Sequence, residues 1–330
     1  MKKVLSLVIV LALALSCTAA LADTLLFATQ ESGTAGYNYA TAIKTVIEAN
    51  VDGVTVSLTA DSDGNVTSPY LIENGAADIV LSNAAPAMWA FNEGIESAGV
   101  PQTPSICCIA GGLGNDFVNV MFTQRFVDET GITTVEDLVA TETPVKLVIK
   151  KNGSFGELAA ERVFAVLGID INNPPAWLEV TKTGGSQIKD GLADDTYDMT
   201  VDHIGAGQAN TTELCLTHDM YDVQLGEDTM AALCEQGFGY VTVPANTWNG
   251  QDTEIKTVGS QQCILVSADM DEELAYNITK ALCENKESLA EASSVLGYFN
   301  PEVAGTMTYT GCNLHPGAAR YYQEMNYAVE

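Results

Sequence analysis

Positive charge is scarce in this sequence. Its 330 residues include 14 lysines and arginines against 43 aspartates and glutamates, which gives a formal net charge of −29. A protein that binds nucleic acid needs clustered basic side chains to neutralise phosphates, and anionic lipid surfaces also attract basic segments. The composition therefore predicts no nucleic-acid partner and no electrostatic attachment to anionic lipid. Strong self-repulsion also favours a soluble monomer.

The signatures of common catalytic sites are missing as well. None of the three histidines, His203, His218 and His315, belongs to an HExxH pattern. The chain has no Gly-x-Ser-x-Gly elbow and no Gly-x-x-x-x-Gly-Lys-Ser/Thr loop for nucleotide phosphates. The sequence therefore predicts no catalytic residue and no cofactor. A secreted hydrolase whose triad assembles only in space is the remaining alternative of this kind. His315, in a Leu-His-Pro-Gly motif, is expected to stabilise a turn.

Metal-binding patterns are absent or incomplete. No two cysteines have CxxC spacing, which structural zinc sites usually require. The segment Asp61–Asn65 begins like an EF-hand calcium loop, but Val66 and Ile72 occupy the positions where that loop needs glycine and glutamate. We therefore expect no metal site.

Cysteines are few, and their number is odd once Cys17 is set aside. An odd number in an exported protein leaves at least one unpaired or paired between chains. The seven cysteines other than Cys17 are interpreted in one of two ways. Either all are small buried hydrophobic residues, or two of them form one disulfide, such as Cys215–Cys234. The seven are Cys107, Cys108, Cys215, Cys234, Cys263, Cys283 and Cys312.

The one long hydrophobic run is at the N-terminus. Lys2 and Lys3 precede an apolar stretch from Val4 to Leu15, and a small-x-small pattern ends at Ala22. This order is typical of a secretory signal peptide, here predicted over residues 1–22. No later apolar run reaches the roughly 18 residues of a membrane span.

Cys17 allows a second interpretation of the N-terminus. Ala14-Leu15-Ser16 before it is an imperfect lipobox, because an aliphatic residue is expected at Ala14. Cleavage after Ala22 is favoured, with lipidation as the alternative. Either outcome predicts a protein in the periplasm or on the outer face of the cytoplasmic membrane.

Short β-branched runs alternate with helical patterns along the chain. Such alternation predicts α/β lobes with mostly parallel sheets flanked by helices. Helices are expected over 39–48, 69–74 and 157–167, with another that Asp269 or Asp271 caps. Strands are expected over 25–28, 54–58, 79–81, 106–110, 118–122, 145–149, 178–181, 198–201 and 262–266.

The pattern restarts near the middle of the chain without a Pro-rich linker, which predicts two lobes joined by hinge strands with a cleft between them. Lobe I is expected to contain residues 23–120 and 255–330, and lobe II residues 121–254. Ligands of such sheets bind beyond the carboxyl ends of the strands. The loops there are rich in Gly, Ser, Thr, Asn and Gln and would offer neutral hydrogen bonds; they are 31–37, 61–68, 82–86, 151–156, 183–187 and 202–208.

Several segments carry a family resemblance, among them residues 64–68, 71–78 and 188–198. Residues 31–39 read Glu-Ser-Gly-Thr-Ala-Gly-Tyr-Asn-Tyr, and residues 153–157 read Gly-Ser-Phe-Gly-Glu. Together with residues 243–252 and 314–322, they resemble the TAXI family, the extracytoplasmic solute receptors of tripartite ATP-independent periplasmic (TRAP) transporters. The sequence departs from the family pattern at Asn65, Ser68 and Asn83.

The resemblance implies a type II periplasmic-binding-protein fold and non-catalytic capture of a solute. It implies a glutamate-like amino acid or C4–C5 dicarboxylate as ligand and a TRAP membrane permease as partner. An ATP-driven importer or a sensor kinase remains the alternative partner.

An anionic ligand would need positive potential, which this chain has mainly at helix N-termini. The start of the helix near Ser154 and the loop before the first helix are the predicted anion sites, although Ser154 serves equally well as a helix cap. Arg162 is expected in an ion pair, and Lys150 and Lys151 in solvent. The alternative to ligand binding is a place in the hydrophobic core for Tyr37 and the stabilisation of a turn for Asn65. The predicted ligand-binding residues are Gly33, Thr34, Tyr37, Asn65, Asn83, Gly153, Ser154, Phe155, Gln187 and Gln208.

Overall fold

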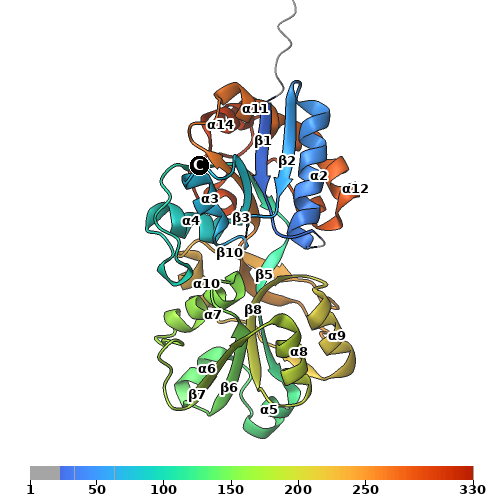
Figure 1. Ribbon diagram of the computed structural model, residues 1–330. Coiled ribbons are helices and arrows are strands. Elements are labelled where there is room, and N and C mark those ends of the chain that lie inside the picture. The colour runs from blue at the N-terminus through green and yellow to red at the C-terminus, as the bar shows by residue number, and fades with distance from the viewer. Residues whose placement is uncertain (1–22, 33, 63, 330) are drawn as a thin grey trace, which may run out of the picture.

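The computed structural model describes residues 23–32, 34–62 and 64–329. The predicted signal peptide, Cys17 and the predicted site residue Gly33 therefore lie outside the described residues. The described chain forms two lobes that lie end to end, each built on its own β-sheet (Figure 1).

The first sheet has the strand order β2-β1-β3-β12-β4. Strand β1 pairs in parallel with β2 and β3, whereas β12 runs antiparallel between β3 and β4. All of β3 is buried, as expected for a strand with helices on both faces. The strands are β1 (Asp23–Ala28), β2 (Val54–Thr59), β3 (Ile79–Asn83), β4 (Ile106–Leu113) and β12 (Gln262–Ser267).

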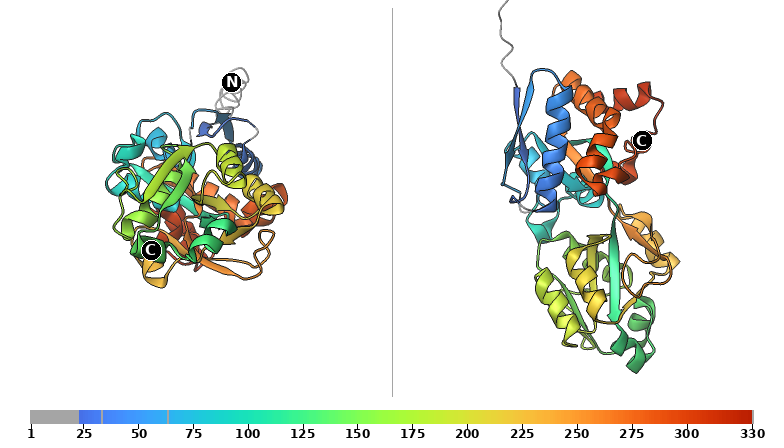
Figure 2. Two further views of the ribbon diagram at one scale, coloured as in Figure 1. Left: turned by 90° about the horizontal axis from the view of Figure 1, so that it is seen from below. Right: turned by 90° about the vertical axis from the view of Figure 1, so that its right-hand side faces the viewer.

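Helices from both ends of the chain cover this sheet. Helix α2 buries Ile43, Val46 and Ile47 at the spacing of one helix face, and it lies beside α11 and α12 (Figure 2). The helices are α2 (Ala35–Asn50), α3 (Ser68–Glu73), α4 (Ala84–Asn92), η1 (Glu96–Ala98), α11 (Glu272–Glu284), α12 (Lys286–Ala292), η2 (Ser294–Tyr298), α13 (Met307–Thr310) and α14 (Pro316–Glu324).

The second sheet has the order β7-β6-β8-β5-β9, and a separate hairpin is formed by β10 and β11. Strand β6 is parallel to β7 and β8, and β5 is antiparallel to β8 and β9. The strands are β5 (Asp116–Thr123), β6 (Val145–Lys150), β7 (Leu178–Thr183), β8 (Met199–Gly205), β9 (Met220–Asp222), β10 (Gly239–Val243) and β11 (Ile255–Gly259). The helices are α5 (Gln124–Thr130), α6 (Val135–Thr141), α7 (Phe155–Val166), α8 (Gly185–Ala193), α9 (Ala209–Thr217) and α10 (Glu227–Cys234).

The chain passes between the two sheets twice, from β4 to β5 and from β11 to β12. These passages lie side by side, because the N–H of Asp116 donates to Oε1 of Gln261 at 2.9 Å. A Cβ added to Gly259 would stand 2.1 Å from the carbonyl oxygen of Asp116, so this approach requires glycine. The predicted lobe boundary at residues 120 and 121 falls inside β5. The division into residues 23–120 plus 255–330 and residues 121–254 remains a prediction.

The predicted strands all occur, some of them longer than expected. Asp271, rather than Asp269, caps α11 by accepting a hydrogen bond from the N–H of Leu274 at 2.9 Å. Two predicted loops are wrong in part. Strand β8 continues to Gly205 because it pairs with β5 along its length, so Asp202 lies in a strand. Helix α8 begins at Gly185 and therefore includes Gln187.

Cys107, Cys108, Cys215, Cys234, Cys263, Cys283 and Cys312 are all free, and every one except Cys234 is buried. The Cys215–Cys234 disulfide, one of the two interpretations of the sequence, is not formed. Within the part of the chain that the structure describes, no helix is long and apolar enough to cross a membrane.

Candidate functional site

The carboxyl ends of the strands in the two lobes face each other, and Ser260 connects them. Asn83, the last residue of β3, donates from its amide to the carbonyl of Ser260 at 2.6 Å. The N–H of Ser260 donates to Nε2 of His203 in β8 at 3.2 Å, and its hydroxyl accepts from the N–H of Ala85 at 2.8 Å. This residue between β11 and β12 therefore joins the strand edges of both lobes.

In the first lobe, the loops after β1, β2 and β3 converge as the parallel arrangement requires. Asn65, in the loop after β2, donates to Oδ1 of Asn83 at 2.8 Å. The side chain of Gln30, in the loop after β1, reaches both the start of α2 and the loop after β2, with Oε1 2.8 Å from a Cβ added to Gly36 and Nε2 3.7 Å from one added to Gly64. The structure thus brings the predicted residues Asn65 and Asn83 together.

Asn83 is buried and has partners for both ends of its amide, Asn65 and Ser260. Those contacts hold the junction together, so a ligand that used this amide would have to displace one of them. The backbone carbonyl of Asn65 accepts hydrogen bonds from the hydroxyls of Ser68 and Ser82. Both asparagines therefore have a structural role as well as a position at the strand edge.

Thr34 caps α2. Its hydroxyl accepts from the N–H of Tyr37 at 3.2 Å and donates to the carbonyl of Glu31 at 2.8 Å. Tyr37 is partly buried in the first turn of that helix. The helix start points its remaining N–H groups beyond the carboxyl end of β1, as an anion site would require.

In the second lobe, Ser154 caps α7 in the same manner. It accepts from the N–H of Glu157 at 3.2 Å and donates to the carbonyl of Lys151 at 2.7 Å. The buried carboxylate of Glu157 accepts from the N–H of Gly153 at 3.0 Å and pairs with Lys182 at 2.5 Å. Among the described residues, the N–H groups of Phe155 and Gly156 have no acceptor. An anion at this helix start would therefore meet two free donors. It would also lie near the ion pair of Asp202 with Lys150, because Oδ1 of Asp202 stands 2.0 Å from a Cβ added to Gly156.

Phe155 lies at the contact between the lobes. Its ring centroid is 4.1 Å from that of His203, and it also approaches Trp89 of α4 at 6.0 Å and Phe238 at 6.1 Å. Burial lowers the pKa of His203 to about 3, so the ring is neutral and its Nε2 can accept the hydrogen bond from Ser260. His203 is therefore part of the junction.

The two predicted glutamines differ in position. Gln187 is exposed on the first turn of α8, with Oε1 2.7 Å from a Cβ added to Gly184. Gln208 caps α9 by accepting from the N–H and the hydroxyl of Thr211 at 2.8 and 3.0 Å. Lys150 is paired with Asp202 at 3.1 Å rather than solvated as expected. Burial raises the pKa of Asp202, while Lys150 opposes the shift.

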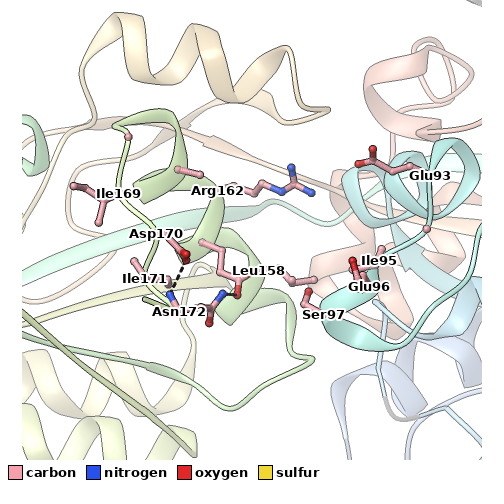
Figure 3. A pocket seen from close by; sticks show the side chains of 14 residues that line it. Glu93, Ile95, Glu96, Ser97, Leu158, Arg162, Ile169, Asp170, Ile171 and Asn172 are labelled. Atoms are coloured by element: carbon pink, nitrogen blue, oxygen red, sulfur yellow. Dashed lines mark hydrogen bonds between the residues drawn. The ribbon is translucent and has the colours of Figure 1, made fainter. Parts of the chain in front are cut away.

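A cavity of about 860 Å³ lies between α7 of one lobe and the segment after α4 of the other. Figure 3 shows Arg162 reaching from α7 toward the segment that carries Glu93 and Glu96. Two further carboxylates, Glu161 and Asp170, line the cavity, and burial raises the pKa of Glu161. None of the predicted ligand-binding residues among those described lines it. Four carboxylates and one guanidinium make it a poor site for an anion.

The prediction of an ion pair for Arg162 is wrong among the described residues. The guanidinium stacks 4.5 Å from the ring centroid of Trp89 and donates to Oε1 of Gln236 at 3.3 Å. Trp89 in turn donates to the carbonyl of Gln236 at 2.8 Å. Sequence reasoning missed Trp89 and Ser260 as junction residues, because no local pattern marks a contact between residues so far apart.

His315 has the structural role expected of it. It caps α14 by accepting from the N–H of Gly317 at 3.2 Å, and its Nε2 lies 3.0 Å from the carbonyl of Met270. The described residues contain no group of three or more His, Cys, Asp or Glu side chains arranged to hold a metal ion.

Comparison with known proteins places this geometry in context. A profile of the NMT1-like family matches residues 27–325. A TctC solute binding protein from Polaromonas, solved with no ligand, has a TM-score of 0.54 and 13% identity, covering 92% of this chain and 98% of its own. MatC from Rhodopseudomonas palustris with bound malate has a TM-score of 0.48 and 11% identity over 83% of this chain and 88% of its own. The Polaromonas likeness concerns the fold, and it confirms the predicted two-lobed α/β fold of periplasmic binding proteins.

Proposed function

The chain belongs to the NMT1-like family, and from this premise we propose that it is a non-catalytic, extracytoplasmic solute-binding protein that captures a small polar metabolite between its lobes. The observation that carries the proposal is the meeting of the two strand edges at Ser260. Loops rich in hydrogen-bonding groups surround that point from both lobes, where ligands of open α/β sheets bind.

The finer assignment that we propose is the TAXI group of receptors. It rests on the segments 31–39, 153–157, 243–252 and 314–322 and includes a TRAP permease as partner. The signal peptide predicted over residues 1–22, with Cys17 as an optional lipid anchor, supports a location outside the cytoplasmic membrane. A receptor of this kind is expected to act as a monomer.

The proposed ligand carries a carboxylate and belongs to the glutamate-like amino acids or C4–C5 dicarboxylates. Support comes from the free N–H groups of Phe155 and Gly156 at the start of α7 and from the matching start of α2 near Thr34. A ligand that touches both starts stabilises the closed arrangement by the contacts it makes only there.

The test is thermal unfolding of the chain from Asp23 onward, with amino acids, dicarboxylates, keto acids, sugars and oligopeptides. A ligand at 100 times its dissociation constant stabilises the folded state by about 2.7 kcal/mol, a shift of a few degrees. A response to glutamate-like acids or dicarboxylates supports the proposal. A response only to sugars or peptides contradicts the carboxylate site, and no response to any compound contradicts the binding function.

The position of the anion is tested by Ser154→Asp. Aspartate caps a helix as well as serine does, but its charge repels a carboxylate at the start of α7. We expect the affinity for the anionic ligand to fall by about tenfold or more. The matched control is Thr134→Asp, which adds the same charge at the cap of α6 in the same lobe. Equal affinities of the two variants contradict the site at α7.

A further inference from the structure

A small polar pocket lies inside the second lobe, between the face of its sheet and helices α8 and α9. Its volume is about 30 Å³, enough for about two water molecules or one small polar group. We call it the inner pocket. It is lined by Asn119, Met121, Lys150, Gly185, Ile188, Lys189, Leu192, Thr200, Asp202, Gln208, Asn210, Thr211 and Leu214.

The inner pocket reaches the strand edge where the proposed solute binds. Lys150 is the last residue of β6, Gly185 is the first of α8, and Gln208 caps α9. The pocket therefore starts among the loops of the proposed site and extends beneath α8 and α9. Of the predicted ligand-binding residues that the structure describes, only Gln208 lines it.

Two polar side chains in the pocket lack protein partners. The hydroxyl of Thr200 is buried without a hydrogen bond, and the residue is only 5% exposed. Asn119 is 6% exposed, and none of the described residues is hydrogen-bonded to its side-chain amide. A buried hydroxyl without a partner, such as that of Thr200, is unfavourable in the folded protein, so such a group usually meets water or a ligand.

The charges that line the inner pocket are already balanced. Lys150 and Asp202 neutralise each other at 3.1 Å, and Lys189 pairs with Glu213 at 2.8 Å. An additional carboxylate would lie against Asp202, and an additional ammonium would lie against Lys150. An uncharged group that both donates and accepts meets neither repulsion, and it matches the amide of Asn119 and the hydroxyl of Thr200.

We propose that the inner pocket receives an uncharged hydrogen-bonding end group of the solute, a carboxamide or a hydroxyl. The inference rests on the proposed solute-binding function, and it replaces one carboxylate of the proposed ligand class by an uncharged amide or hydroxyl. The carboxylate of the solute binds at the helix starts, while its other end enters beside Asn119 and Thr200. Monoamides are then preferred over the dicarboxylates of equal length.

The test is isothermal titration of the chain from Asp23 onward with two matched pairs, glutamine against glutamate and succinamate against succinate. We expect the amide of at least one pair to bind about tenfold more tightly than its acid. Thr200→Val keeps the shape of the side chain and removes the hydroxyl. It should lower amide affinity by about tenfold and leave the midpoint of unfolding without ligand unchanged or higher.

The matched control is Thr103→Val, because Thr103 also has a buried hydroxyl without a partner but lies in the first lobe. It should leave affinity unchanged. If a compound binds but acid and amide bind equally, and Thr200→Val matches the wild type, the inner pocket holds only water and this inference is wrong while the binding function stands. If none of the four compounds binds the wild type, both this inference and the proposed ligand class are contradicted.

Discussion

The backbone N–H of Ser260 donates to Nε2 of His203 at 3.2 Å, a contact between residues 57 positions apart in the chain. Ser260 lies on one of the two passages between the sheets, and His203 lies on the strand edge of the second lobe. The same serine binds Asn83 and Ala85 on the first lobe. The relative placement of the lobes therefore depends on a neutral imidazole that accepts a hydrogen bond.

His203→Phe keeps an aromatic ring against Phe155 but removes the acceptor for Ser260. We expect a loss of about 1–3 kcal/mol in the free energy of unfolding at pH 7.5, because the buried N–H is left unpaired. Urea denaturation measures it. His218→Phe, at an exposed position, is the control and should change little.

His203→Phe also tests how the free energy of unfolding depends on pH. The pKa of His203 is lowered to about 3 in the folded chain. Between about pH 6.5 and pH 3, this imidazole is therefore protonated in the unfolded chain but not in the folded chain. The wild type should therefore lose about 1–2 kcal/mol between pH 7.5 and pH 5 through this residue. The variant should lack that loss, and equal slopes for the two proteins would show that the pKa of His203 is the same in the folded and unfolded chains.

Asp222→Asn should stabilise the protein near neutral pH. Burial raises the pKa of Asp222 to about 6, so the folded chain favours the protonated form and loses stability as the pH rises through that value. The variant should gain about 1–3 kcal/mol at pH 7.5 and none below about pH 4. Urea denaturation at pH 7.5 and at pH 4 measures this gain in the free energy of unfolding. A gain that persists at pH 4 would point to a cause other than the ionisation of Asp222.

Ser154→Ala should cost about 1 kcal/mol, because α7 loses the hydroxyl that accepts from Glu157. Ser154→Gly should cost only a few tenths of a kcal/mol, since glycine is tolerated at this position. Thermal unfolding without ligand compares them. Similar losses in both variants would mean that the two hydrogen bonds of the hydroxyl, to Lys151 and Glu157, set the cost, and that the tolerance of glycine at a helix start does not offset them.

Trp89→Phe should report on the contact between the lobes. It removes the hydrogen bond to the carbonyl of Gln236 and weakens the stacking of Arg162. We expect a destabilisation of about 1–2 kcal/mol. Tryptophan emission during ligand titration should then change less in this variant than in Trp177→Phe, because Trp177 directly precedes β7, at the opposite end of the sheet from the junction. An unaltered emission change in Trp89→Phe would show that the contact does not respond to ligand.

The sequence by itself determined the elements and their order. Alternation and helical spacing identify β1, β2, α2 and α7 because side-chain burial within one element follows a local period. Caps are equally local: Ser154 and Asp271 each bond an N–H three residues ahead. Family motifs and the two-lobed α/β class followed from the same information.

Only the tertiary structure decided what the polar side chains do. Asn83 and Asn65 were predicted from their loops, but their amides reach each other and Ser260, which is 177 positions beyond Asn83. Arg162 stacks on the indole of Trp89 instead of pairing with a carboxylate. Asn119 and Thr200 line the same pocket, although each lies within a mostly apolar strand. The physical reason is that an amide, a hydroxyl or a guanidinium can interact with many different partners at nearly equal free energy. Which partner each side chain has therefore depends on which distant segments pack against it.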